Sequence, residues 1–230
     1  MTIHLERDLL LLKRRLLEAS TLAEQAIRRA TAALANKDTD LARSVIAGDD
    51  EIDAREIEVE EEAIRVLAIH QPVATDLRFI AACLKINNDL ERIGDLAAKV
   101  AKRVLDLYAT PTDDPPIPNK LMELSELVIN HLRRALDAFA RGDVALAREV
   151  RMDDDPIDGI HRELFFLMRE QMKQSPKLVE PASSILSISS SLERIADHVT
   201  NIAEDVIYMV GGEIVRHPGN PPRGASSTGG

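Results

Sequence analysis

The chain has 230 residues, a net charge of −10 and a single cysteine, Cys83. One cysteine excludes a disulfide framework and any zinc or iron–sulfur site that needs several thiolates. The acidic balance argues against nucleic acid and anionic lipid as partners, because both would repel the protein. No stretch reaches about 18 uncharged apolar residues, and the first residues lack the pattern of a secretory signal, so we expect a cytoplasmic protein that does not insert into a membrane.

Apolar residues recur every three or four positions along most of the chain, which predicts long amphipathic helices. Asn36, Lys37 and Asp38 end the first stretch, and Pro72 is expected in the first turn of the third helix. The fifth stretch is interrupted or restarted at Pro156. Six long helices are predicted, with apolar positions over residues 5–33, 41–69, 80–107 and 121–139, and two further stretches that end near residues 174 and 211.

Four prolines between residues 110 and 119 mark the best domain boundary, because proline disrupts a helix interior. We therefore predict an all-α protein with a three-helix bundle over residues 1–110, a linker over 111–118 and a second three-helix bundle over 119–211. Residues 212–230 are rich in glycine and proline and are predicted to be a disordered tail.

The two halves repeat the same motifs in the same order. Leu90–Asp95 matches Leu192–Asp197 at an offset of 102 residues, and Asp49–Asp53 matches Asp154–Asp158 at an offset of 105. Ordered matches on both sides of a proline-rich centre indicate a duplicated unit, so the two bundles are expected to be related by pseudo-symmetry.

The repeated motifs carry acidic pairs one helical turn apart, where side chains share a helix face and like charges repel. Clustered carboxylate oxygens suit hard cations such as Fe(III), Mn, Mg or Ca. The predicted metal ligands are Asp49, Asp53, Glu91, Asp95, Asp154, Asp158, Glu193 and Asp197. The alternative interpretation is an exposed helix face with local salt bridges, or, in the second half, Asp155 as a helix N-cap followed by Pro156.

Helical phase places these acids relative to the core. Glu91 and Asp95 fall opposite the apolar stripe of their helix, so we expect both at the surface and unburied. Asp50 is in phase with Ile57 and Ile64, which predicts a position near the buried edge of its helix. Cys83 is expected in the packed core.

Little in the sequence indicates catalysis. His161 and His198 lie close to predicted ligands, but lone histidines at helical positions are expected to be structural or solvated. The chain has no nucleophile elbow, no phosphate-binding glycine loop and no Glu-x-x-His motif, which argues against hydrolases, P-loop proteins and di-iron enzymes. We therefore expect no catalytic residues and no enzyme activity, with a carboxylate-rich metalloenzyme or a plain structural bundle as the alternatives.

The paired Leu-Glu-Arg-Ile-(Gly/Ala)-Asp motifs, together with Asp76-Leu77-Arg78, resemble the PhoU phosphate-signalling family across residues 1–212. This resemblance implies two pseudo-symmetric three-helix bundles in a cytoplasmic regulator, often a homodimer. It also implies partners: the ATPase subunit of the phosphate ABC transporter and a sensor histidine kinase, with repression of the phosphate-starvation response when phosphate is plentiful.

The resemblance further implies metal ions, multinuclear iron clusters among them, on the eight acidic positions named above. The second half departs from the first at two places: Pro156 stands where the first half has Glu51, and Ser191 stands where it has Asp89. The two sites are therefore expected to differ in affinity or nuclearity.

Overall fold

The computed structural model describes residues 3–109, 117–153 and 155–215, and within these ranges the secondary structure is helical, without a strand. The elements are α1 (Ile3–Asn36), α2 (Thr39–Ala47), α3 (Asp49–His70), α4 (Ala74–Leu107), α5 (Asn119–Arg141), α6 (Val144–Met152), α7 (Asp155–Gln174), the 3₁₀ turn η1 (Pro176–Leu178) and α8 (Val179–Gly211). The predicted linker, apart from Ile117 and Pro118, and most of the predicted tail lie outside the described residues.

The all-α prediction is confirmed, and the second and fifth predicted stretches are each divided into a short and a long helix. Asp38 caps α2 by accepting a hydrogen bond from the Leu41 amide at 2.8 Å. Asp143 caps α6 in the same way, with the Leu146 amide at 3.0 Å. The helix predicted to include Pro72 instead begins at Ala74, with Pro72 in the preceding connection.

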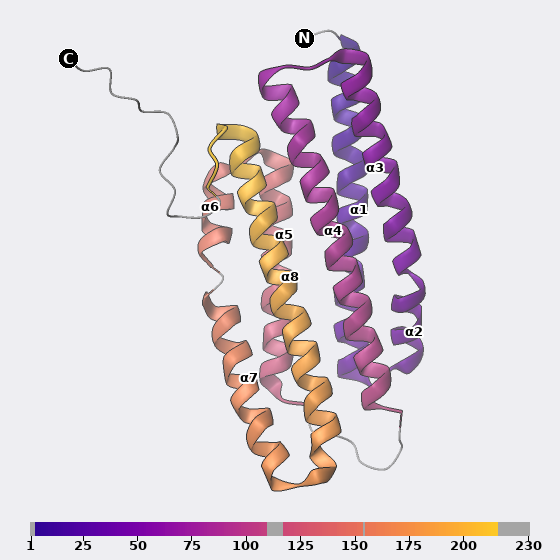
Figure 1. Cartoon of the computed structure of the whole chain (residues 1–230), viewed down its shortest axis with the longest axis vertical. Coiled ribbons are helices and arrows are strands. Elements are labelled where there is room, and N and C mark those ends of the chain that lie inside the picture. The colour runs from indigo at the N-terminus through magenta and orange to yellow at the C-terminus, as the bar shows by residue number, and fades with distance from the viewer. Residues whose placement is uncertain (1–2, 110–116, 154, 216–230) are drawn as a thin grey trace, which may run out of the picture.

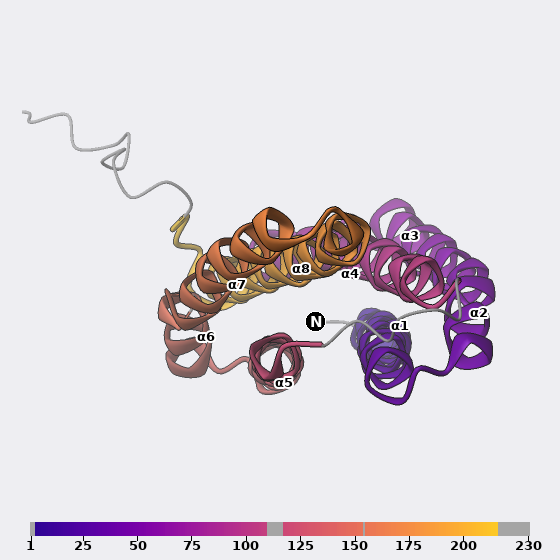
Figure 2. The same ribbon diagram turned by 90° about the horizontal axis from the view of Figure 1, so that it is seen from below.

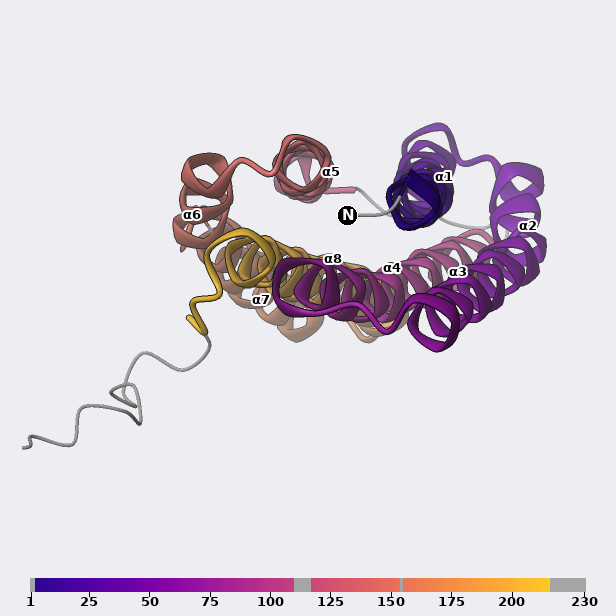
Figure 3. The same cartoon turned by 90° about the horizontal axis from the view of Figure 1, so that it is seen from above.

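The long helices run nearly parallel to the long axis of the molecule (Figure 1). Seen from either end, α7, α8, α4 and α3 form one curved layer, with α5 and α1 on its concave side and the short α6 and α2 at the edges (Figures 2 and 3). The buried side chains are mostly Leu, Ile, Val and Ala, so the core is aliphatic. No helix in the described part of the chain combines the length and apolar character that a membrane crossing requires.

The pseudo-symmetry is visible in the contacts between α4 and α8, which lie antiparallel at the centre of the layer. Lys85 Nζ donates to Asp205 Oδ1 at 3.2 Å near one end, and Arg103 Nε donates to Ser187 Oγ at 3.1 Å near the other. With the offset of 102 residues, Lys85 corresponds to Ser187 and Arg103 to Asp205. The two contacts are therefore related to one another by a pseudo-two-fold axis that passes between them.

Helices α1 and α5 also join the halves, on the concave side of the layer. Lys13 Nζ donates to the Ala140 carbonyl at 2.7 Å, and Arg133 pairs with Glu24 at 3.1 Å. The two bundles are thus packed together through both layers of helices.

Candidate functional site

The acidic motifs of the first half meet where the start of α3 packs on the middle of α4. Helix α3 begins with three acids, whose charge is favourable at a helix N-terminus. Ile52 of α3 lies against Gly94 of α4, where an added Cβ would come within 2.8 Å of Ile52 Cδ1 and 3.6 Å of Asp49 Oδ1. The absence of a side chain at Gly94 therefore lets the two helices approach closely and brings their carboxylates together.

The four predicted first-half ligands form one electrostatic cluster. Burial, followed by repulsion from Asp95 and Asp53, raises the pKa of Asp49. Burial also raises the pKa of Glu91, with Arg92 opposing this rise and Asp95, Asp53 and Asp49 adding to it. The structure thus brings all four side chains into mutual repulsion, as the duplicated motif predicts.

Glu91 is more buried than its helical phase predicts. Its side chain is 17% exposed and that of Asp95 is 36% exposed. The prediction of an unburied surface position was wrong for Glu91, because α3 covers the face of α4 that lies away from the main core. Arg92 Nε pairs with Glu91 Oε2 at 3.2 Å, yet this oxygen is buried and has no aligned hydrogen-bond donor among the described residues.

The second half repeats the arrangement with α7 and α8. Asp158 lies in the first turn of α7, and Glu193 and Asp197 lie on α8. Burial raises the pKa of Glu193, and Asp197 and Asp158 add to the rise. Burial and Asp158 raise the pKa of Asp197 in the same way. The fourth predicted ligand, Asp154, lies outside the described residues.

These donor sets fit a hard cation in their chemistry. They are carboxylate oxygens, and burial together with neighbouring acids disfavours the charged forms of Asp49, Glu91, Glu193 and Asp197. Within the described ranges, no three His, Cys, Asp or Glu side chains stand close enough together to hold one metal ion. A bound cation would therefore have to draw together carboxylates that now repel one another.

The prediction from helical phase that Asp50 lies near the buried edge of its helix was also wrong. Asp50, Ile57 and Ile64 lie on the exposed side of α3, with Ile57 55% exposed and Ile64 60% exposed. The buried side carries a different apolar stripe that includes Val59 and Val66. Asp50 therefore faces solvent and needs no buried partner.

The comparisons with known proteins agree with this duplicated geometry, because one family model matches the chain twice. Residues 16–104 and residues 121–206 each match the family model of the PhoU domain. The chain belongs to the PhoU family.

Similarity to members of the PhoU family extends along most of the chain. The phosphate-specific transport system accessory protein PhoU homolog of Rhizobium meliloti (strain 1021) is 37% identical over 211 residues, which cover 90% of this chain and 87% of the relative. The crystal structure of PhoU from Pseudomonas aeruginosa aligns with a TM-score of 0.86 at 36% identity, covering 90% of this chain and 99% of that structure. PhoU from Streptococcus pneumoniae aligns with a TM-score of 0.85 at 30% identity, covering 92% and 99%.

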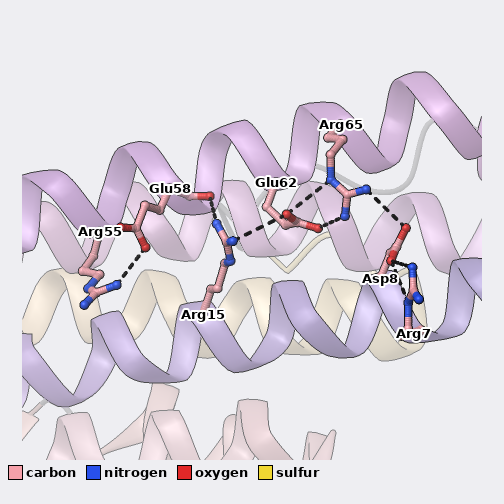
Figure 4. Close-up of polar contacts among 7 residues, drawn as sticks. All are labelled: Arg7, Asp8, Arg15, Arg55, Glu58, Glu62 and Arg65. Atoms are coloured by element: carbon pink, nitrogen blue, oxygen red, sulfur yellow. Dashed lines mark hydrogen bonds and ion pairs between the residues drawn. The ribbon is translucent and has the colours of Figure 1, made fainter.

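The structure of this PhoU family member also contains a buried charge network that the sequence analysis missed (Figure 4). Asp8 of α1 and Glu62 of α3 are each 5% exposed. Arg65 pairs with both, at 3.5 Å from Asp8, while His70 Nε2 lies 3.0 Å from Asp8 Oδ2. The hydrogen bond with His70 is the main cause that lowers the pKa of Asp8.

This network holds α3 against α1. Arg15 of α1 adds to it, donating to the Glu58 carbonyl at 3.1 Å. A signal for the network was present in the sequence, since Asp8 shares the helical phase of Leu5 and Leu12 in the buried stripe of α1. A carboxylate in that phase predicts a buried ion pair.

Proposed function

We propose that this member of the PhoU family is a cytoplasmic regulator of phosphate homeostasis that links a phosphate ABC transporter to a sensor histidine kinase. In this proposal it represses the phosphate-starvation response when phosphate is plentiful. The observation that carries the proposal is the similarity over about nine-tenths of the chain to relatives named as phosphate-specific transport system accessory proteins. The protein acts as a homodimer and contacts the ATPase subunit of the transporter.

Cation binding is the second part of the proposal. The ligands are the eight acids Asp49, Asp53, Glu91, Asp95, Asp154, Asp158, Glu193 and Asp197, and the ions are hard cations, including multinuclear iron. Two features of the site support this: the burial and mutual repulsion that raise the pKa of Asp49 and Glu91, and the buried Glu91 Oε2, which Arg92 Nε approaches at 3.2 Å without forming a hydrogen bond. A cation would neutralise the repulsion and coordinate this oxygen.

The proposal further holds that the protein regulates without chemical turnover, in keeping with the accessory role in the names of its relatives. A hydrolase or phosphatase rate that depends on metal and disappears with Glu91→Gln would contradict it. The assay uses the purified full chain, with metal and with chelator.

The test of the regulatory role combines binding and genetics. The full chain should capture the ATPase subunit of the phosphate transporter and the sensor kinase of its own host in a pull-down. A strain without the chain should express a phosphate-starvation reporter at high phosphate, and a plasmid copy should restore repression. A reporter that stays repressed in the deletion strain, or a chain that captures neither protein, would refute the role.

A further inference from the structure

The exposed side of α3 carries two isoleucines with two acids between them. Their spacing of three and four residues places them on one face of the helix, which we call the α3 face: Ile57, Glu60, Glu61 and Ile64. Both isoleucines are more than half exposed. Neither acid has a salt-bridge partner among the described residues, since Arg55 and Arg65, the arginines of α3, pair with other carboxylates. The α3 face is therefore a small apolar surface with two unpaired negative charges.

The exposed side of α7 has the opposite arrangement, with two aromatic side chains between two arginines. We call this surface the α7 face: Arg162, Phe165, Phe166 and Arg169. Phe165 is 46% exposed and Phe166 is 56% exposed, and the two rings pack edge to face with centroids 5.8 Å apart. Neither arginine forms a salt bridge with another described residue, and the acids beside them, Glu163 and Glu170, pair with lysines. The α7 face is thus an apolar surface flanked by two positive charges.

The duplication makes the two faces equivalent parts of the two halves. At the offset of 105 residues that relates the acidic motifs of α3 and α7, Ile52 corresponds to Ile157 and Val59 to Leu164, and all four side chains are buried. At the same offset the isoleucines of the α3 face correspond to the arginines of the α7 face, and the acids correspond to the phenylalanines. The buried positions have therefore kept their apolar character, whereas every position of the exposed faces has exchanged a charge for an apolar side chain or the reverse.

The two faces complement each other when their helices pack antiparallel. With a shift of one helical turn in either direction, Phe166 meets an isoleucine and Glu61 meets an arginine. Apolar side chains of both helices then leave water, and opposite charges lie together beside them. Pairing of like faces is disfavoured, because two α3 faces would bring carboxylates together and two α7 faces would bring guanidinium groups together. The α3 face therefore selects an α7 face over a second α3 face.

The contact must come from a second copy, because the two faces lie too far apart within one. Helices α3 and α7 are the outer helices of the curved layer, with α4 and α8 between them (Figures 2 and 3). Each outer helix is joined to its inner neighbour by a short connection, and α4 and α8 are antiparallel, so α3 and α7 run in opposite directions. A two-fold rotation about the long axis of the molecule keeps these directions and sets α3 of each copy on α7 of the other. The contact then occurs twice and the assembly is closed.

From this complementarity we propose that the chain forms a two-fold homodimer in which the α3 face of each copy binds the α7 face of the other. The proposal rests on the homodimer put forward under the proposed function and adds its interface. It accounts for the four large apolar side chains that the two faces expose in the monomer.

Charge reversal tests the interface in the full chain, with the dissociation constant of the dimer measured by sedimentation at physiological ionic strength. Glu60→Arg with Glu61→Arg makes both faces positive, and Arg162→Glu with Arg169→Glu makes both faces negative. Either double variant alone should raise the dissociation constant by about tenfold or more, because both contacts of the dimer then join like charges. An equimolar mixture of the two variants should restore the wild-type value, since both contacts then join opposite charges.

The matched control is Glu123→Arg with Glu126→Arg, which makes the same change of charge at exposed positions of α5 outside both faces. It should leave the dissociation constant unchanged. Circular dichroism melts confirm that each variant is folded.

Cross-linking provides a second readout that does not depend on charge. The native thiol of Cys83 is buried and does not compete with introduced cysteines. A short bismaleimide should link Glu61→Cys on one copy to Arg162→Cys or Arg169→Cys on the other when the variants are mixed. Copies that carry Glu61→Cys alone should stay unlinked, because the α3 face does not meet itself.

The outcomes separate the interface from the homodimer. If the wild type is a dimer but both double variants dimerise as tightly as the wild type, or if mixing them restores nothing, the α3–α7 interface is refuted while the homodimer stands. If the wild type sediments as a monomer at every concentration, the homodimer and its interface both fail.

Discussion

Replacing His131 by leucine should flatten the dependence of stability on pH. This α5 side chain is 4% exposed, and its Nε2 is buried without a hydrogen-bond partner among the described residues. Burial, with a smaller contribution from Arg134, lowers the pKa of His131 to about 4. Relative to the ordinary value of about 6.5, this corresponds to about 3 kcal/mol in favour of the neutral ring in the folded state.

The sign follows from proton binding. Between about pH 6.5 and pH 4 the unfolded chain protonates His131 and the folded chain does not, so the free energy of unfolding falls as pH falls. From pH 7 to pH 5, protonation of His131 in the unfolded chain should lower the free energy of unfolding of the wild type by about 2 kcal/mol. For a chain of this size this corresponds to a decrease of about 4–8 °C in Tm. His131→Leu should lose less stability than wild type over that interval by this amount.

The assay is urea and thermal unfolding at pH 7, 6 and 5 for wild type, His131→Leu and the exposed control His4→Leu. The control should keep the wild-type slope, because the His4 side chain is exposed and folding does not bury it. If His131→Leu loses as much stability as wild type between pH 7 and pH 5, His131 is not held neutral by burial and the reasoning is wrong.

Three further predictions concern the first half and the core. Glu91→Gln with Asp95→Asn should lower the metal content of the first half only. It should also raise the stability of the metal-free protein by a few tenths of a kcal/mol, because the repulsion between the two carboxylates is relieved. Elemental analysis and thermal melts with chelator check this, and a variant that keeps its metal and melts at a lower temperature than wild type would contradict it. Gly94→Leu should lower the free energy of unfolding by about 1–3 kcal/mol, because the new side chain overpacks against α3. In the control Gly159→Ala the added Cβ meets no atom within 4 Å, so this change should raise the free energy of unfolding by about 0.5–1 kcal/mol. Equal destabilisation by the two changes in urea unfolding would refute the close approach at Gly94. Cys83 is fully buried and its thiol pKa is raised, so iodoacetamide should modify it only after denaturation, and fast labelling of the native protein would oppose this.

Much of the fold was predictable because its signals are local. Asp38 and Asp143 are capping residues whose side chains accept hydrogen bonds from the first turns of the helices that follow them. The duplication could be recognised in the sequence because the same acids recur in both halves at offsets of 102 and 105 residues. The boundaries of the two domains, 1–110 and 119–211, stay a prediction.

The depth of individual side chains was not predictable, because it depends on how many neighbours a helix has. α4 packs against α1, α3 and α8, so Glu91 is mostly buried although it lies opposite the main apolar stripe. α3 carries two apolar stripes, and only packing decides that Val59 is inside and Ile57 outside.

The antiparallel contact of α4 with α8 has a consequence for how the chain avoids pairing with itself. If two first halves from separate copies associated through this seam, Lys85 would face Arg103 of the other copy in place of Asp205, and two cations would repel. Asp89, which now accepts a hydrogen bond from His198, would face Leu96 and lose its partner in an apolar surrounding. Divergence after duplication has thus made the first half a better match for its covalent neighbour than for a second copy of itself, which disfavours assemblies in which two first halves pair through α4.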